Sequence, residues 1–144
     1  MTTLYTFTGS NLVLSGIAVD KAHNIYFSTT GAIYKVDSLG QNPTYVAGKN
    51  GSADGTGIGA GFSGVFELRV NKDGDLVAAD ENKIRLITPA GVVTTLAGTA
   101  AIGLQDGDGN VAAFRFAVGL TIDASGAMYV ADDANARIRK IVHK

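Results

Sequence analysis

Hydrophobic residues in this chain form short runs, and residues that favour turns interrupt them. Near the C-terminus, runs at residues 119–123, 127–132 and 137–141 are separated by turn-forming residues at 124–126 and 133–135. Valine, isoleucine and aromatic residues are typical of strands, whereas Gly, Asp and Asn favour the turns that connect them. The pattern predicts three short β-strands joined by tight turns.

The same arrangement occurs twice more upstream, which indicates an internal repeat. The strands expected in the two upstream copies lie at residues 16–20, 24–28, 32–36, 44–48, 66–71, 76–80, 83–87 and 92–97. A further strand is expected at residues 1–8, where Leu4, Tyr5 and Phe7 are interleaved with threonines. No long stretch keeps the apolar spacing of a helix, so we expect essentially no helix and antiparallel meanders instead.

The copies also share a period. Asp54-Gly55 recurs as Asp106-Gly107, 52 residues later, and Phe62 recurs as Phe114 at the same spacing. A four-stranded antiparallel unit that repeats at roughly 40 to 50 residues is typical of the blades of a β-propeller. The expected fold class is therefore all-β, with three four-stranded antiparallel blades in one chain.

The third copy carries four motifs in order. They are Asp106-Gly-Asp-Gly-Asn-Val-Ala-Ala-Phe114, Gly119-Leu-Thr-Ile-Asp123, Met128-Tyr-Val-Ala-Asp132 and Asn135-Ala-Arg-Ile-Arg-Lys140. This series resembles bacterial NHL repeats, and the resemblance covers nearly the whole chain. The second copy departs from it at Glu67 and Asn82, and the first copy lacks the Asp-Gly loop. The resemblance implies a propeller in which each blade places its first strand at the axis and its fourth at the rim.

The resemblance also implies how the ring closes, because NHL-type propellers look as if their N-terminal strand completes the last blade. Residues 5–9 match residues 94–98, an expected rim strand. The chain then divides into a spare rim strand at 1–8, a first blade at 9–48, a second at 49–98 and a third at 99–144 that lacks its rim strand.

Three blades are fewer than the roughly four to eight of known rings. We therefore expect a homodimer that forms a six-bladed ring, in which residues 3–8 of each chain pair with residues 137–142 of the other. The residues expected at these junctions are Leu4, Tyr5, Phe7, Arg137, Ile138, Arg139 and Ile141. The alternative is a fragment of a longer NHL propeller protein.

Composition narrows the range of functions. Apolar residues make up 46% of the chain and charged residues 17%, which supports a packed core. The net charge of −1 argues against nucleic acid as a partner, since its binding proteins are usually basic. The absence of cysteine excludes disulfides and thiolate chemistry. The N-terminal segment has no basic start and no long apolar run, so we expect neither a signal peptide nor a membrane span.

Three motifs suggest chemistry but lack the context that it requires. Residues 55–60 match a loose dinucleotide-binding pattern, yet a strand rather than a helix is expected after them. Residues 106–110 resemble the start of a calcium loop, but Val111 and Ala117 stand where glycine and glutamate belong. Residues 61–65 lack the last glycine of a serine nucleophile elbow. We expect turn and loop roles for all three, and no cofactor or metal.

A candidate ligand face consists of Thr29, Asp80 and Asp132. The two aspartates end the second strands of their copies, and Thr29 takes that place in the first copy. There they would surround the axis and bind a cation or a polar ligand. The alternative is that the two aspartates cap turns by accepting hydrogen bonds from backbone N–H groups. His23 and His143 have no partner nearby in the sequence, so neither is assigned a role.

Basic residues gather at the C-terminus, namely Arg137, Arg139, Lys140, His143 and Lys144. No clear aromatic platform accompanies them, so we interpret them as solvated strand positions rather than an RNA-binding face. The expected function is a non-enzymatic binding scaffold for a protein or a small polar ligand. The alternative is a propeller-type hydrolase or lyase that acts at the axis, although only two histidines and two glutamates (Glu67 and Glu81) are present to bind a metal.

Overall fold

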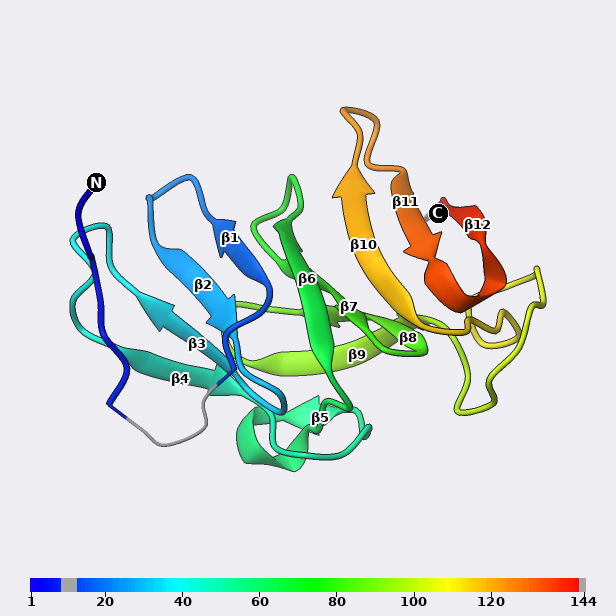
Figure 1. Cartoon of the computed structure of the whole chain (residues 1–144), viewed down its shortest axis with the longest axis horizontal. Coiled ribbons are helices and arrows are strands. Elements are labelled where there is room, and N and C mark those ends of the chain that lie inside the picture. The colour runs from blue at the N-terminus through cyan, green and yellow to red at the C-terminus, as the bar shows by residue number, and fades with distance from the viewer. Residues whose placement is uncertain (9–12, 143–144) are drawn as a thin grey trace.

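The computed structural model describes residues 1–8 and 13–142. It contains three antiparallel sheets that lie side by side, and Figure 1 shows the N-terminal segment at one end of this row and the C-terminal strand at the other. Each sheet is a meander in which consecutive strands pair with each other, as the sequence predicts. We call the three sheets blades 1, 2 and 3.

The blades differ in their number of strands. Blade 1 consists of β1 (Ile17–Val19), β2 (Ile25–Ser28), β3 (Ile33–Val36) and β4 (Thr44–Ala47). Blade 2 consists of β6 (Val65–Val70), β7 (Leu76–Asp80), β8 (Lys83–Ile87) and β9 (Val92–Ala97), with the short β5 (Gly55–Thr56) paired to the outer edge of β9. Blade 3 has only β10 (Ala117–Ile122), β11 (Met128–Asp132) and β12 (Arg137–Ile141).

Three features differ from the sequence-based expectation. Two single turns of 3-10 helix, η1 (Gly57–Gly59) and η2 (Asp133–Asn135), and the strand β5 lie in segments that we expected to be loops. Residues 1–8 form no strand within the chain. They run along blade 1, where the Phe7 ring lies edge-on to Phe27 and to Tyr34 at 5.4 Å, so side chains pack without backbone pairing. No helix among the described residues is long and apolar enough to cross a membrane.

The hydrophobic core lies between the blades rather than within one of them. Between blades 1 and 2, Tyr26 and Ile33 belong to the same buried cluster as Phe62 and Leu68. Between blades 2 and 3, the corresponding cluster includes Ile84 and residues of β10 and β11. Each blade therefore has two faces that need a neighbour, because burial of apolar area is the main source of stability.

The recurring Asp or Asn after each first strand holds the hairpin to the second strand. Asp20 Oδ1 accepts hydrogen bonds from the N–H groups of Ala22 and Asn24, both at 2.9 Å. Asn71 makes the same pair of bonds in blade 2, and Asp123 makes them in blade 3. The hydrogen bond from Ser125 and the backbone bond from Ala127 hold the pKa of Asp123 below its usual value.

These turns predict a loss of stability in acid. A carboxyl group whose pKa is lowered on folding stabilises the fold above its unfolded pKa of about 4, and this contribution disappears as the pH falls through the folded pKa. Asp123→Asn should keep the turn, since Asn71 holds the same turn with an amide oxygen, and should flatten the dependence on pH. Urea unfolding at pH 7, 5 and 3 measures this. An unchanged slope in the variant would contradict the assignment.

Candidate interaction site at the open edge of blade 3

A buried arginine lies at the centre of blade 2. The Arg85 side chain is fully buried and donates to Asp80 Oδ2 at 2.8 Å and to Asp54 Oδ1 at 2.9 Å. It also donates to the backbone carbonyls of Ala53 and Gly61, and its guanidinium lies 5.4 Å from the centre of the Phe62 ring. Arg85 therefore fastens the Asp-Gly loop before β6 to the blade.

Blade 3 repeats this arrangement. Arg139 donates to Asp132 Oδ2 at 3.0 Å and to Asp106 Oδ1 at 2.6 Å, and its guanidinium lies 5.0 Å from the centre of the Phe114 ring. It also donates to the carbonyls of Gln105 and Ala113. The two Asp-Gly motifs of the sequence are thus the loop ends of two equivalent ion-pair networks.

Blade 1 has Tyr34 at the position of these arginines, as the strand register indicates. Tyr34 stacks on Phe27 at 5.8 Å and contacts Phe7 and Tyr45 through its ring edge or face. Aromatic packing thus replaces the ion pair in the blade that lacks the Asp-Gly loop.

The three residues of the candidate ligand face are all buried. The Asp80 carboxylate accepts hydrogen bonds from the N–H groups of Ser63 and Gly64 in addition to Arg85. Asp132 accepts a bond from the Arg115 N–H, and Thr29 bonds to the Ala32 carbonyl. The aspartates therefore hold strand ends and an arginine in the interior instead of facing open space.

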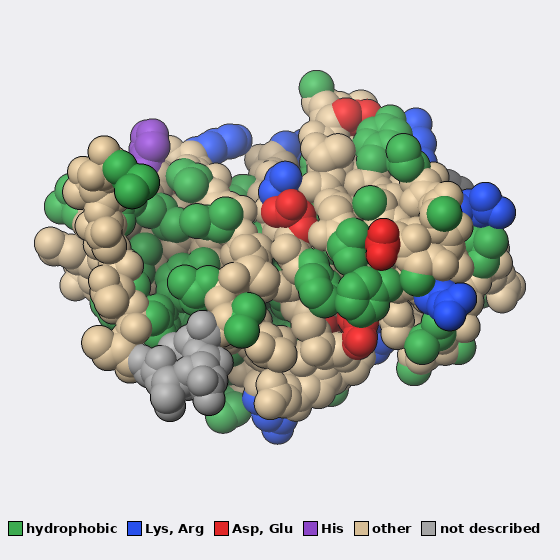
Figure 2. Space-filling model, in the orientation of Figure 1, with side chains coloured by type: hydrophobic (Ala, Val, Ile, Leu, Met, Phe, Trp, Pro, Cys, Tyr) green, Lys and Arg blue, Asp and Glu red, His purple; other side chains and the backbone are tan. Residues whose placement is uncertain are grey.

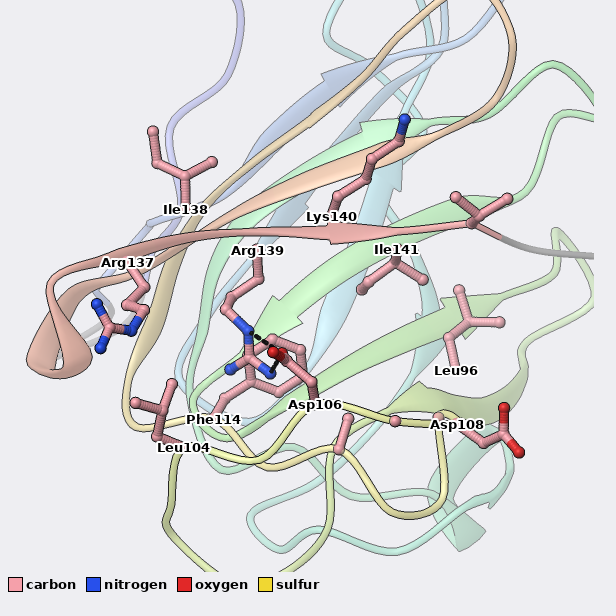
Figure 3. A pocket seen from close by; sticks show the side chains of 14 residues that line it. Leu96, Leu104, Asp106, Asp108, Phe114, Arg137, Ile138, Arg139, Lys140 and Ile141 are labelled. Atoms are coloured by element: carbon pink, nitrogen blue, oxygen red, sulfur yellow. Dashed lines mark hydrogen bonds and ion pairs between the residues drawn. The ribbon is translucent and has the colours of Figure 1, made fainter.

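A groove runs along the outer edge of β12 (Figure 3). It has a volume of about 900 Å³. One wall is β12 and the other is the segment 106–109, with Leu96, Ala112 and Phe114 also lining it. No described residue pairs with the outer edge of β12. An unpaired strand edge is a template for another strand.

Comparison with blade 2 shows what this groove lacks. In blade 2, the N–H of Thr95 donates to Asp54 Oδ2 at 3.0 Å, and the Thr95 hydroxyl bonds to Oδ1 at 2.7 Å. Burial raises the pKa of Asp54, but these bonds and the Arg85 guanidinium outweigh it and lower the pKa overall. The equivalent Asp106 side chain is 92% exposed, against 50% for Asp54, and within the described chain only Arg139 bonds to it.

The outer faces of blades 1 and 3 expose residues whose equivalents are buried. Ile17 of β1 is 60% exposed, whereas Leu68 and Leu120 at the same register position are 0% and 4% exposed. On β12, Ile138 is 83% exposed, whereas the equivalent Ile84 is 0% exposed. Figure 2 shows hydrophobic side chains gathered over β1, β2 and β3 at the N-terminal end.

The residues expected at the ring junctions lie at the two ends of the row of blades. Leu4 and Tyr5 are exposed, and Phe7 is partly buried against blade 1. At the other end, Arg137 and Ile138 are exposed, while two side chains of β12 turn toward the groove, namely those of Arg139 and Ile141 (Figure 3). The sequence analysis did not predict that Arg139 points inward. Alignment of the two Asp-Gly loops together with Arg85 and Arg139 could have indicated it.

A second feature that the sequence analysis missed is an exposed aromatic pair. The rings of Phe66 and Phe116 lie 4.9 Å apart, where β6 and β10 begin, and both are more than a third exposed. Phe116 has a φ of 76°, in the left-handed region that bulky residues rarely adopt. Residues held in this region cluster at functional sites. Its N–H donates to Asn82 Oδ1 at 3.3 Å, in the turn after β7.

The remaining candidate motifs take loop positions. Residues 55–59 form β5 and η1, and the Asp108 carbonyl, in the loop that resembles a calcium site, accepts hydrogen bonds from the N–H groups of Val111 and Ala112. His23 lies in the β1–β2 turn, and His143 lies outside the described residues. Among the described residues, no group of three or more His, Cys, Asp and Glu side chains is placed to hold a metal ion.

Solved structures resemble this chain over almost its whole length. An auxiliary nutrient binding protein from Bacteroides thetaiotaomicron is 27% identical, with a TM-score of 0.82 over 96% of this chain and 39% of that chain. A protein provisionally named a phosphatase from the same organism is 25% identical, with a TM-score of 0.80 over 95% and 36%. Virginiamycin B lyase from Staphylococcus aureus is 16% identical, with a TM-score of 0.58 over 88% and 40%.

These likenesses establish a β-propeller fold, in agreement with the three antiparallel sheets and the near absence of helix. The chain spans about two fifths of the length of these solved chains, 39% and 36% for the first two. No family model and no curated protein matches the sequence.

Proposed function

We propose that this protein is a binding module of the NHL-repeat kind, in which two chains form one six-bladed ring without catalysing a reaction. The observation that carries the proposal is the contrast in exposure at equivalent positions. Ile84 is buried because blade 3 covers it, and Ile138 is exposed because no blade follows within the described chain. Blade 1 presents the complementary face through Ile17.

A second copy is the partner that suits both faces at once. Rotation by half a turn brings blade 3 of each chain beside blade 1 of the other, and the two contacts are then identical. Six blades are within the range of about four to eight that closed rings adopt. The proposed ring also hides the hydrophobic residues over β1–β3, which in one chain form an exposed patch.

Light scattering coupled to size-exclusion chromatography tests this assembly on the full chain. We expect twice the chain mass at micromolar concentrations. A monomer would overturn the dimeric ring and favour the alternative, that these residues belong to a longer propeller.

We place the ligand at the end of the ring marked by Phe66 and Phe116. Phe66 lies at the start of β6 and Phe116 directly before β10, and these first strands are the axial strands in a propeller of this type. Exposed aromatic rings bind planar or apolar groups through their faces. The auxiliary nutrient binding protein, at 27% identity, supports a binding role, whereas the lyase, at 16% identity, bears only on the fold.

The double variant Phe66→Ala/Phe116→Ala should weaken binding of the planar probe 1-anilinonaphthalene-8-sulfonate by about tenfold, the effect of losing one good aromatic contact. Fluorescence titration of the dimer measures this. Ile58→Ala removes an exposed hydrophobic side chain from η1 and serves as the control. Equal affinity in both variants would remove the aromatic pair from the binding site.

A further inference from the structure

We propose that the groove along β12 receives residues 3–8 of a second copy as the fourth strand of blade 3, with Tyr5 opposite Lys140. This inference rests on the proposed dimeric ring and names the segment that joins its two halves. It follows from the internal repeat, because blade 2 contains the same groove in a filled state.

In blade 2, the rim strand β9 lies between two partners, β8 on one side and β5 on the other. Blade 3 has both equivalents, with β12 corresponding to β8 and residues 107–108 corresponding to β5. These two segments form the walls of the groove, and no described strand lies between them. The vacant position therefore has pairing groups on both sides, which suits an inserted strand better than a small ligand.

The sequence of the N-terminal segment sets the register. Residues 5–9 match residues 94–98, which places Leu4 at the position of Val93 and Thr6 at that of Thr95. In blade 2, Val93 pairs with Ile87 and is buried with Phe62. Leu4 would accordingly lie opposite Ile141 and pack on Phe114, which lines the groove.

Thr6 supplies the donors that Asp106 lacks. In blade 2, Thr95 gives Asp54 one bond from its N–H and one from its hydroxyl. In blade 3, both bonds that Asp106 accepts within the described chain go to Oδ1 and come from Arg139, so Oδ2 has no donor there, and Asp106 lines the groove. A threonine one strand away matches this acceptor in both geometry and chemistry.

The position of Phe7 agrees with the same register. Phe7 matches Leu96, which turns to the other side of its strand and packs toward the next blade. Phe7 already contacts Phe27 and Tyr34 of its own blade 1 at 5.4 Å. In the ring, blade 1 of one chain follows blade 3 of the other. Phe7 can therefore keep its contacts with blade 1 of its own chain while Leu4 and Thr6 enter the partner's groove.

Disulfide trapping tests the register. The chain has no native cysteine, so only the introduced cysteines can form a disulfide. Tyr5→Cys and Lys140→Cys are made in separate full-length chains, which are mixed and oxidised. Directly opposed residues of antiparallel strands lie about 4.5–5.5 Å apart at Cα, within the range for a disulfide. We expect a covalent heterodimer on a non-reducing gel. Tyr5→Cys with Arg137→Cys is the control, because Arg137 lies three residues from Lys140 on β12 and its side chain faces the other side of the sheet.

The outcomes separate the two proposals. A dimer by light scattering in which Tyr5→Cys traps no better with Lys140→Cys than with Arg137→Cys would overturn the strand exchange and leave the ring intact. A monomer would overturn both. A covalent dimer from the Lys140→Cys pair alone supports both.

A double-mutant cycle tests the hydrogen bond. Thr6→Val and Asp106→Ala should each weaken the dimer about a hundredfold, because a hydrogen bond to a charged group is lost at both junctions and each loss costs about tenfold. The double variant should weaken it by little more than either single change. Thr95→Val removes the same bond within blade 2 and should leave the dimer constant unchanged. Additive effects of the two substitutions would show that the Thr6 hydroxyl does not bind Asp106.

Discussion

Ile138→Asp should convert the proposed dimer to monomer, with at least a hundredfold rise in its dissociation constant. Ile138 is 83% exposed in one chain, so an aspartate there costs the isolated blade almost nothing. In the ring it would occupy the position at which Ile84 is fully buried. An unpaired carboxylate at such a position loses its hydration without compensation. Sedimentation equilibrium measures the constant.

Two further variants sharpen this test. Ile17→Asp alters the opposite face and should have the same effect, because each junction joins one face of each kind. Ile58→Asp is the matched control, since Ile58 is 73% exposed but lies in η1, away from both faces. Equal dimer constants for Ile138→Asp and Ile58→Asp would show that the face of blade 3 is not an interface.

The strands were predictable because their signals are local. Those at residues 76–80, 83–87, 92–97 and 137–141 agree with β7, β8, β9 and β12 to the residue. Each is a short apolar run between turn residues, and the aspartate or asparagine after the first strand supplies its own turn through bonds to the nearby backbone. The residues that form each turn are close together in the sequence, so the local pattern is sufficient to predict the strand and its turn.

The ion-pair networks were not predictable in this way. Asp54 reaches Arg85 and Thr95, which follow it by 31 and 41 residues. Arg85 follows Asp80 by five residues, but Arg139 follows Asp132 by seven, because the turn of blade 3 is longer and contains η2. Because the two spacings differ, the aspartate–arginine pairs do not align in the sequence. The sequence therefore predicts Arg139 only as a strand residue at the junction.

The short strand β5 shows the same limit. Gly55 and Thr56 carry no strand signal, and they pair with β9 only because the loop is fastened beside it by Arg85 and Asp54. Its equivalent in blade 3, residues 107–108, has no rim strand beside it within the described chain. Tertiary contacts thus decide the conformation of these loops, whereas the apolar pattern decides that of the blades.

Asp80→Ala should lower the free energy of unfolding by about 3–5 kcal/mol, the usual cost of breaking a buried ion pair by removing one partner. Arg85 and Asp80 are both fully buried, so the variant leaves the buried guanidinium with Asp54 as its acidic partner and leaves the N–H groups of Ser63 and Gly64 without their acceptor. Asp106→Ala is the matched control: Asp106 also pairs with an arginine, but it is 92% exposed, and its loss should cost about 1 kcal/mol or less. Urea unfolding in the Ile138→Asp background separates folding from assembly, which otherwise adds a dependence on protein concentration. Equal costs for the two substitutions would mean that burial does not set the strength of these networks.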